Sequence, residues 1–360
     1  MTQFDSIPGI PAHTKVPIYL KVMGALSIAA IVLSGAALSR SDSPKAAAVS
    51  ASGVGASQLL PPEYETIAEP ADIVAARYDP TTKPVAPGPK TFELTTTEKV
   101  VQIGDTKVRM WMFNGSAPGP VLRAVVGDRI TIKITNDASS TFLHSVDYHA
   151  SRLTLGGGHV QVKPGESGEY SFIAEYPGVF MYHCATAPVV QHIGMGMYGM
   201  LIVQPKEGFG PSLPEFAITQ SEIYSSLQGI QSKSPVAMAF NGVPSQYVKA
   251  PITLPANQSI RLFVLNAGPS ELSSFHVVGT VFDRVLEDGN PKNTTYGRQT
   301  LAMGASGGGV FEMKFVGEGQ FPMVTHQFNH AAMGAVGMFL TGDGKPGPGG
   351  IADPGSHGHS

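Results

Sequence analysis

The sequence predicts an all-β protein made of two tandem β-sandwich domains. Glycine and proline contribute 42 and 29 of the 360 residues without the three-residue period of collagen, and this abundance of turn formers favours short strands over long helices. Short runs of β-branched and aromatic residues alternate with clusters of Gly, Pro, Asn and Asp. Motifs of the first half recur in the second half in the same order, which indicates duplication of one sandwich.

The N-terminal segment predicts export. Residues 22–38 carry no charge and are flanked by basic residues, as in a secretory signal. Their length is at the lower edge of the roughly 17–25 residues that span a bilayer, so residues 1–40 are predicted to be a cleaved signal peptide or a membrane anchor. Residues 41–90 are predicted to be a flexible linker and lead-in. We therefore expect the protein in the periplasm or on the outer face of the cytoplasmic membrane.

Two predicted domains follow, at residues 91–205 and 213–342, and a Gly/Pro-rich tail at 343–360 is predicted to be disordered. Strands of the first domain are expected, for example, at residues 121–126, 129–134, 168–173 and 199–203. The repeated motifs are Phe-Asn-Gly at 113–115 and 240–242, RITIKITN at 129–136 with SIRLFVLN at 259–266, GVF at 178–180 with GQF at 319–321, and GMLI at 199–202 with GMFL at 337–340.

Charge and cysteine content narrow the possible partners. Lysine and arginine number 24 against 27 aspartates and glutamates, so the formal net charge is −3 and the basic footprint of a nucleic-acid-binding protein is absent. The sequence has one cysteine, Cys184, which cannot form an internal disulfide. In an exported protein such a cysteine needs another role, such as metal ligation.

Histidines crowd around this cysteine. His144, His149 and His183 belong to a group of five histidines within 49 residues of the first half. Strand side chains alternate between faces, so Asp147 and His149 share one face of an extended segment and His144 takes the other. His183 and Cys184 point to opposite faces for the same reason. Two sites are therefore predicted back to back, one holding His144 with Cys184 and the other His149 and Asp147 with His183.

The first predicted site has the ligands of a blue-copper centre. Cys184 is followed by His192 and then by Met197 in a loop rich in Gly, Pro and Met. Two imidazoles, a thiolate and a weak thioether are the ligand set of a type 1 electron-transfer copper. Met195 could replace Met197 as the axial ligand, and each of these residues alone is common in an ordinary core.

The second predicted site offers only His149 and His183, whereas a catalytic metal site typically has three protein ligands and one open position. The best candidate for the third ligand is His326, which ends a strand-like segment. His330 competes with it four residues later. A single histidine at a strand end is more often structural, so this assignment is the weaker of the two.

These residues together resemble one family, the two-domain copper-containing nitrite reductases within the multicopper-oxidase superfamily. The resemblance covers residues 90–342 and rests on FNGSAPGPVLRAVVGD, HSVDYH, the YHC triplet with its later His and Met, SSFHVVG and the late VTH. It implies two cupredoxin-like Greek-key sandwiches and a homotrimer with each active site at a subunit interface. It implies a type 1 copper on His144, Cys184, His192 and Met197, and a type 2 copper on His149 and His183 with His326 of the neighbouring subunit.

The resemblance also implies the catalytic groups. Asp147 and His276 match the family's aspartate and histidine pair, and Val278 matches an aliphatic residue that caps the substrate site. The family's best-known form of this segment reads HLIGGH, and here Thr280 and Val281 replace its last Gly-His. This replacement is expected to affect substrate access to the site and the reaction rate. The loop between the cysteine and the second type 1 histidine is also one residue shorter than in common members, which bears on the colour and potential of the type 1 site.

The implied reaction is the reduction of nitrite to nitric oxide with one electron and two protons, the electron passing from the type 1 to the type 2 copper through His183-Cys184. The electron donor is expected to be a small cupredoxin or a cytochrome c. One alternative is an electron-transfer cupredoxin anchored through residues 22–38 that lacks reductase activity. Another is a two-domain laccase, which typically needs His-x-His pairs, and none occurs between residues 90 and 342. Copper content distinguishes them, since a reductase binds two ions per chain, the carrier one and the laccase four.

Overall fold

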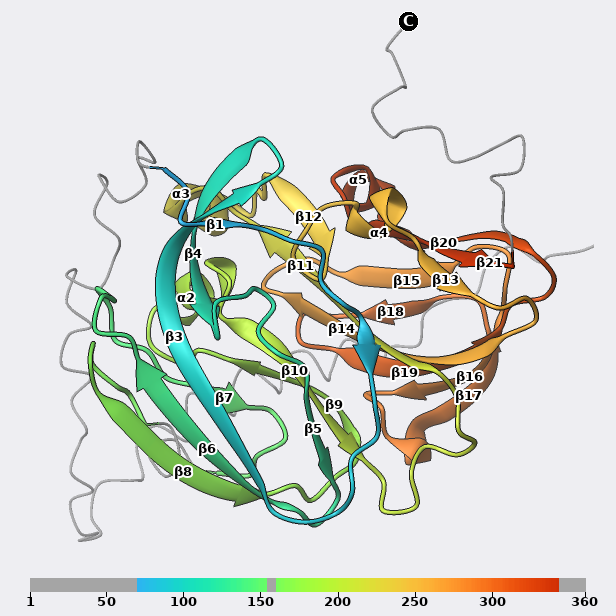
Figure 1. The fold of residues 1–360 in the computed structure, drawn as a ribbon, viewed down its shortest axis with the longest axis horizontal. Helices are drawn as coiled ribbons and strands as arrows, with labels where there is room; N and C mark the ends of the chain where they lie inside the picture. The colour runs from blue at the N-terminus through green and yellow to red at the C-terminus, as the bar shows by residue number, and fades with distance from the viewer. Residues whose placement is uncertain (1–69, 154–159, 343–360) are drawn as a thin grey trace, which may run out of the picture. The chain divides into compact units, whose positions relative to one another are not determined.

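Short strands joined by turns dominate the computed structural model, which describes residues 70–153 and 160–342 (Figure 1). The predicted signal or anchor at 1–40, most of the predicted linker and the predicted tail at 343–360 lie outside the described residues. Within the described ranges, no helix is both long and apolar enough to cross a membrane.

The first domain contains two sheets, counted over the described residues. One is five-stranded and comprises β1 (Ile73–Val74), β3 (Lys90–Ile103), β4 (Thr106–Phe113), β6 (Arg129–Asn136) and β8 (Ser167–Ile173). The other is four-stranded and comprises β5 (Leu122–Val125), β7 (Asp147–Tyr148), β9 (Gly178–His183) and β10 (Tyr198–Gln204). A short helix, α2 (Val189–Gly194), connects β9 to β10.

The second domain also contains two sheets in the part of the chain that the structure describes. The larger comprises β2 (Thr81–Thr82), β11 (Glu215–Ile223), β12 (Ala237–Phe240), β14 (Ser259–Gly268), β16 (Phe282–Glu287), β17 (Thr294–Arg298) and β19 (Gly308–Lys314). The smaller comprises β13 (Ile252–Leu254), β15 (Ser273–Val277), β18 (Leu301–Met303), β20 (Gly319–Thr325) and β21 (Val336–Thr341). The helical turns are α3 (Leu227–Ser232), α4 (Gln246–Lys249), η3 (Pro291–Asn293) and α5 (Phe328–Ala332). The predicted all-β class with two sandwich domains is therefore confirmed.

The repeated Phe-Asn-Gly motif marks the same turn in both domains. Asn114 and Gly115 have φ angles of 52° and 72°, and Asn241 and Gly242 have φ angles of 55° and 83°. Two consecutive residues with positive φ form a tight turn of the kind that asparagine followed by glycine adopts at least cost.

The repeated Gly-Met motif has a packing reason. Gly199 in β10 pairs with Tyr182 in β9, and Gly337 in β21 pairs with Met323 in β20. A Cβ atom at Gly199 would lie 2.3 Å from the Tyr182 ring, and one at Gly337 would lie 2.2 Å from the Met323 side chain. Equivalent strand pairs therefore need a glycine at equivalent positions, and this register relates residues of the two domains.

A shared apolar layer lies between the domains. Met181 and Met200 from β9 and β10 belong to one buried cluster with Phe263 of β14 and Val310 of β19. The outer face of the first domain's four-stranded sheet is thus covered by the second domain, which explains why β10 is buried along its whole length.

The described part of the predicted lead-in, residues 70–89, supplies β1 and β2. β1 pairs in parallel with β3 of the first domain, and β2 pairs antiparallel with β11 of the second. This segment therefore ties the two domains together.

Candidate metal centres

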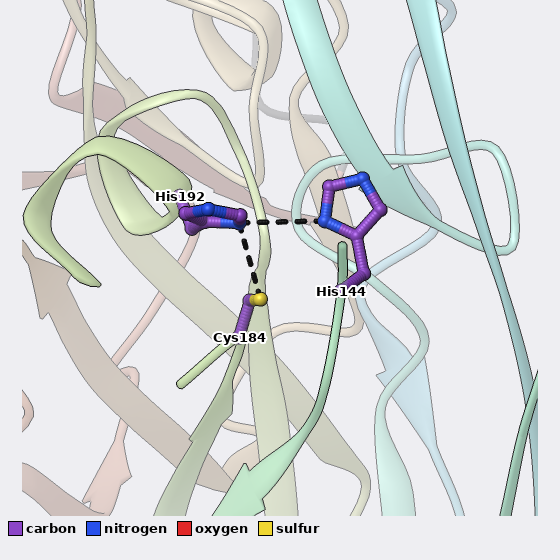
Figure 2. A group of neighbouring side chains, drawn as sticks. All are labelled: His144, Cys184 and His192. Carbon is purple, nitrogen blue, oxygen red and sulfur yellow. Dashed lines mark hydrogen bonds between the residues drawn. The ribbon is translucent and has the colours of Figure 1, made fainter. Parts of the chain in front are cut away.

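His144, Cys184 and His192 converge in the interior of the first domain (Figure 2). The Cys184 Sγ atom lies 3.2 Å from His192 Nδ1, and His192 Nδ1 lies 3.3 Å from His144 Nδ1. Each of the three residues is at most 2% exposed. Ligand atoms bound at roughly 2.0–2.3 Å to one ion lie within about 4.6 Å of one another, so this spacing fits a single ion.

Three elements position these side chains. His144 lies just before β7 and is held by a bridge to Val162, with backbone bonds of 3.1 and 2.8 Å. Cys184 directly follows the last residue of β9, and His192 lies in α2. As the alternation of side chains along a strand predicts, the Cys184 side chain points away from the face that its neighbour His183 occupies.

The environment of Cys184 favours its thiolate form. Burial alone would raise the pKa of the thiol, but the adjacent His192 and His144 imidazoles outweigh burial and hold this pKa well below its ordinary value. The Ser145 backbone N–H also points at the sulfur, 3.4 Å away. A thiolate is the form that binds a metal ion.

The two candidate methionines are both buried in the core that contains Cys184. Met197 is tied by its backbone to two of the candidate ligands, because its N–H donates to His192 O and its carbonyl accepts from Cys184 N, both over 3.1 Å. The Met195 carbonyl instead accepts from Trp111 N. Met197 is thus joined through its backbone to two candidate ligands, and Met195 is joined instead to Trp111.

Two further residues contact the candidate ligands, and neither was predicted from the sequence. Glu98 Oε1 lies 3.0 Å from His144 Nε2, and the Trp111 ring centre lies 5.3 Å from that of His144 and 4.6 Å from that of His192. Burial raises the pKa of the Glu98 carboxyl, but the His144 imidazole and the Phe142 backbone N–H outweigh it and lower the pKa overall. Trp111 is the sole tryptophan of the sequence and precedes the Phe-Asn-Gly motif, so it could have been singled out from the sequence. Glu98 gives none, because its TTTEK surroundings are typical of an exposed strand face.

A second cluster contains Asp147, His149 and His183. His149 Nε2 lies 3.0 Å from His183 Nε2, and His183 Nε2 lies 3.9 Å from Asp147 Oδ2. His183 Nδ1 lies 2.9 Å from the Cys184 carbonyl oxygen, so Nδ1 carries the proton and Nε2 presents a lone pair. Burial, and then the neighbouring His183, lower the pKa of His149, which keeps this imidazole neutral and able to bind a metal ion.

The candidate residues of the second domain do not join this cluster within the part of the chain that the structure describes. The His276 and His326 rings lie 5.1 Å apart at the end of the β15–β20 pair. His326 is exposed, whereas His330 is buried with its Nε2 3.7 Å from Glu271 Oε2. Val278 is 42% exposed on the same strand end. His326 is therefore accessible at the surface, whereas His330 is not.

The comparisons with known proteins agree with this chemistry. A multicopper oxidase family model matches residues 95–208. The copper-containing nitrite reductase of Neisseria gonorrhoeae is 35% identical over 263 residues, which cover 68% of this chain and 67% of that protein. A copper nitrite reductase structure from Nitrosomonas europaea superposes with a TM-score of 0.68 at 33% identity and covers 74% of this chain and 99% of that chain. The copper-containing nitrite reductase of Thermus scotoductus gives a TM-score of 0.67 at 32% identity, with 75% and 68% coverage.

Proposed function

Because this chain belongs to the copper-containing nitrite reductase family, we propose that it reduces nitrite to nitric oxide. The observation that carries the proposal is the adjacency of His183 and Cys184 in the chain, with one residue in each of the two metal-ligating clusters. A single peptide linkage therefore connects a site suited to electron transfer with a site suited to catalysis.

The donor atoms support one copper ion in each cluster. A buried thiolate with two imidazoles and a methionine suits a type 1 copper on Cys184, His144, His192 and Met197. Two facing imidazoles with an adjacent carboxylate suit a type 2 copper on His149 and His183. When bound, the two ions would supply a one-electron relay and a Lewis-acid position for nitrite.

The protein's own groups handle the protons. Conversion of nitrite to nitric oxide and water consumes one electron and two protons, so an acid must lie beside the substrate position. Asp147 is half-buried and lies next to His183, so we assign it as one of the two proton donors. We assign the second proton donor to His276, whose Nδ1 is held by the Gln299 carbonyl and whose orientation is thereby fixed.

The catalytic site is incomplete within one chain. Two imidazoles are fewer than the three protein ligands typical of a catalytic metal site. His326 is exposed, lies beside His276 and is separate from the His149 cluster. We therefore infer that His326 of a neighbouring subunit completes the site, with His276 and Val278 facing the substrate, in a closed cyclic assembly such as a trimer.

The experiment that tests the proposal is anaerobic release of nitric oxide from nitrite by the copper-loaded protein, driven by an artificial one-electron reductant. We expect release that is abolished in His149→Ala, while the type 1 absorbance persists. The copper content should be two ions per chain. A protein that keeps its type 1 absorbance, binds one copper per chain and releases no nitric oxide would be an electron carrier instead.

A further inference from the structure

Glu98 makes a contact with the type 1 ligand set that none of the functions described above uses. Its side chain is 4% exposed, and its Oε1 atom lies 3.0 Å from His144 Nε2. The same oxygen accepts a hydrogen bond of 3.0 Å from the Phe142 backbone N–H. A carboxylate buried this deeply and held by two groups has a fixed position relative to the imidazole.

The contact determines which nitrogen of His144 can bind a metal ion. An ionised carboxylate only accepts hydrogen bonds, so the proton of the neutral imidazole must lie on Nε2. Nδ1 then carries the lone pair, and this is the atom that lies 3.3 Å from His192 Nδ1 in the cluster with Cys184. A carboxylate that accepts from a ligating imidazole also makes the ligand more basic.

We propose that Glu98 is a positioning residue of the type 1 site, which fixes the orientation of His144 and, through its negative charge, favours Cu(II) over Cu(I). The inference rests on the proposed type 1 copper on His144, Cys184 and His192. The charge would lower the reduction potential of that copper and so increase the driving force for electron transfer toward the catalytic site.

A purely structural role for Glu98 is the competing explanation, and the second domain isolates it. Glu222 is the equivalent residue, because Glu98 pairs with Trp111 and Glu222 with Met238, each two residues before the repeated Phe-Asn-Gly. Glu222 is 2% exposed and accepts from the backbone N–H groups of Ser270 and Glu271 over 2.8 and 2.7 Å. Each glutamate thus accepts from backbone N–H groups of the segment that leads into β7 or into β15.

The two glutamates differ in the other side chain that each carboxylate contacts. Asp147 pairs with His183 and His276 pairs with Val324, and His183 and Val324 follow the equivalent Tyr182 and Met323. Ser273, three residues before His276, is therefore equivalent to His144, and its hydroxyl donates to Gln220 rather than to Glu222. Glu222 instead accepts from the Tyr224 hydroxyl. The equivalent glutamate therefore shares the structural contact and lacks the contact with a metal ligand.

The test compares Glu98→Gln with Glu222→Gln in the copper-loaded full chain. Each glutamine keeps a side-chain oxygen that can accept from the same backbone N–H groups, and each substitution removes the negative charge of the carboxylate. We expect Glu98→Gln to retain its type 1 absorbance and to lose about tenfold in preference for Cu(II), which is an upward shift of about 59 mV for a one-electron couple. Glu222→Gln should lower thermal stability to a similar extent without shifting the potential.

The outcomes separate this inference from the proposed function. A wild-type protein without type 1 absorbance would overturn the copper site itself. A wild-type site with normal absorbance and a Glu98→Gln potential equal to that of wild type and of Glu222→Gln would overturn the role of Glu98 alone.

A measurement on the wild-type protein covers the case in which Glu98→Gln does not fold. Pulsed EPR of the Cu(II) form reports the hydrogen bond at the remote nitrogen of each ligating imidazole. We expect one nitrogen, assigned to His144, with the coupling of an N–H that donates to a carboxylate. Two nitrogens that both have the coupling of a solvated imidazole would contradict the proposal.

Discussion

Co-expression of two inactive variants, His149→Ala and His326→Ala, should restore nitrite reduction. Each site is proposed to need His149 and His183 from one chain and His326 from its neighbour. The first variant retains His326 and the second retains the His149 cluster, so an interface with the right order of chains has a complete ligand set. Such complementation is impossible if each chain builds its own site.

The expected recovery follows from the geometry. With random assembly from equal amounts, half of the chains carry an intact His149 cluster and half of their neighbours carry an intact His326, so about one quarter of the sites in a closed ring are complete. The assay is anaerobic nitric oxide release per chain in the unselected mixture, compared with wild type and with each variant alone.

The matched control is a mixture of His149→Ala and His183→Ala. The Nε2 atoms of these two residues lie 3.0 Å apart in one chain. Every chain in that mixture therefore lacks one histidine of the cluster, and no nitrite reduction should be restored. The reasoning would be refuted by a mixture of His149→Ala and His326→Ala no more active than its components, or by full activity of His326→Ala alone.

Four other predictions follow from the described contacts. Asp147→Asn should slow nitrite turnover by about 10²–10⁴-fold without changing the type 1 absorbance, and an unchanged rate would remove Asp147 from proton delivery. Trp111 fluorescence should be quenched by copper loading, because its ring packs on the His144 and His192 imidazoles of the proposed type 1 site; a titration with constant fluorescence would contradict this proposal. Met197→Leu should change the type 1 spectrum and potential more than Met195→Leu, and the reverse order would exchange their roles. Phe275→Ala should destabilise the second domain by about 3–5 kcal/mol in denaturant unfolding, since the ring is fully buried; a loss below 1 kcal/mol would contradict that.

Local periodicity was sufficient to group the first-domain candidates. Strand alternation alone separates Cys184 from His183 and places His149 on the face of Asp147, and the structure brings these residues together in two clusters accordingly. Likewise, the repeated Phe-Asn-Gly could be interpreted as a turn from residue type alone, because few residues other than asparagine and glycine adopt positive φ readily. These features depend on neighbours in the chain.

Contacts between distant strands were not accessible in the same way. Glu98 reaches His144 across 46 residues, and nothing in the alternation of β3 says which segment will cover a given face. β1 and β2 could not be predicted either, because two residues are too few to show the alternation of apolar and polar side chains that indicates a strand. Both form because they hydrogen-bond to β3 and β11. Sequence spacing also does not give the burial that distinguishes the exposed His326 from the buried His330.

Duplication explains why the two proposed proton donors come from different domains. Asp147 pairs with His183, which adjoins Tyr182, and His276 pairs with Val324, which adjoins Met323. Since Tyr182 and Met323 are equivalent through their glycine partners, Asp147 and His276 occupy the same position of the duplicated sandwich. An assembly that brings the first domain of one chain against the second domain of the next therefore places the same strand end on both sides of the substrate. One ancestral position would thus supply an acid on one side and an imidazole on the other, and neither chain alone would hold both beside the metal.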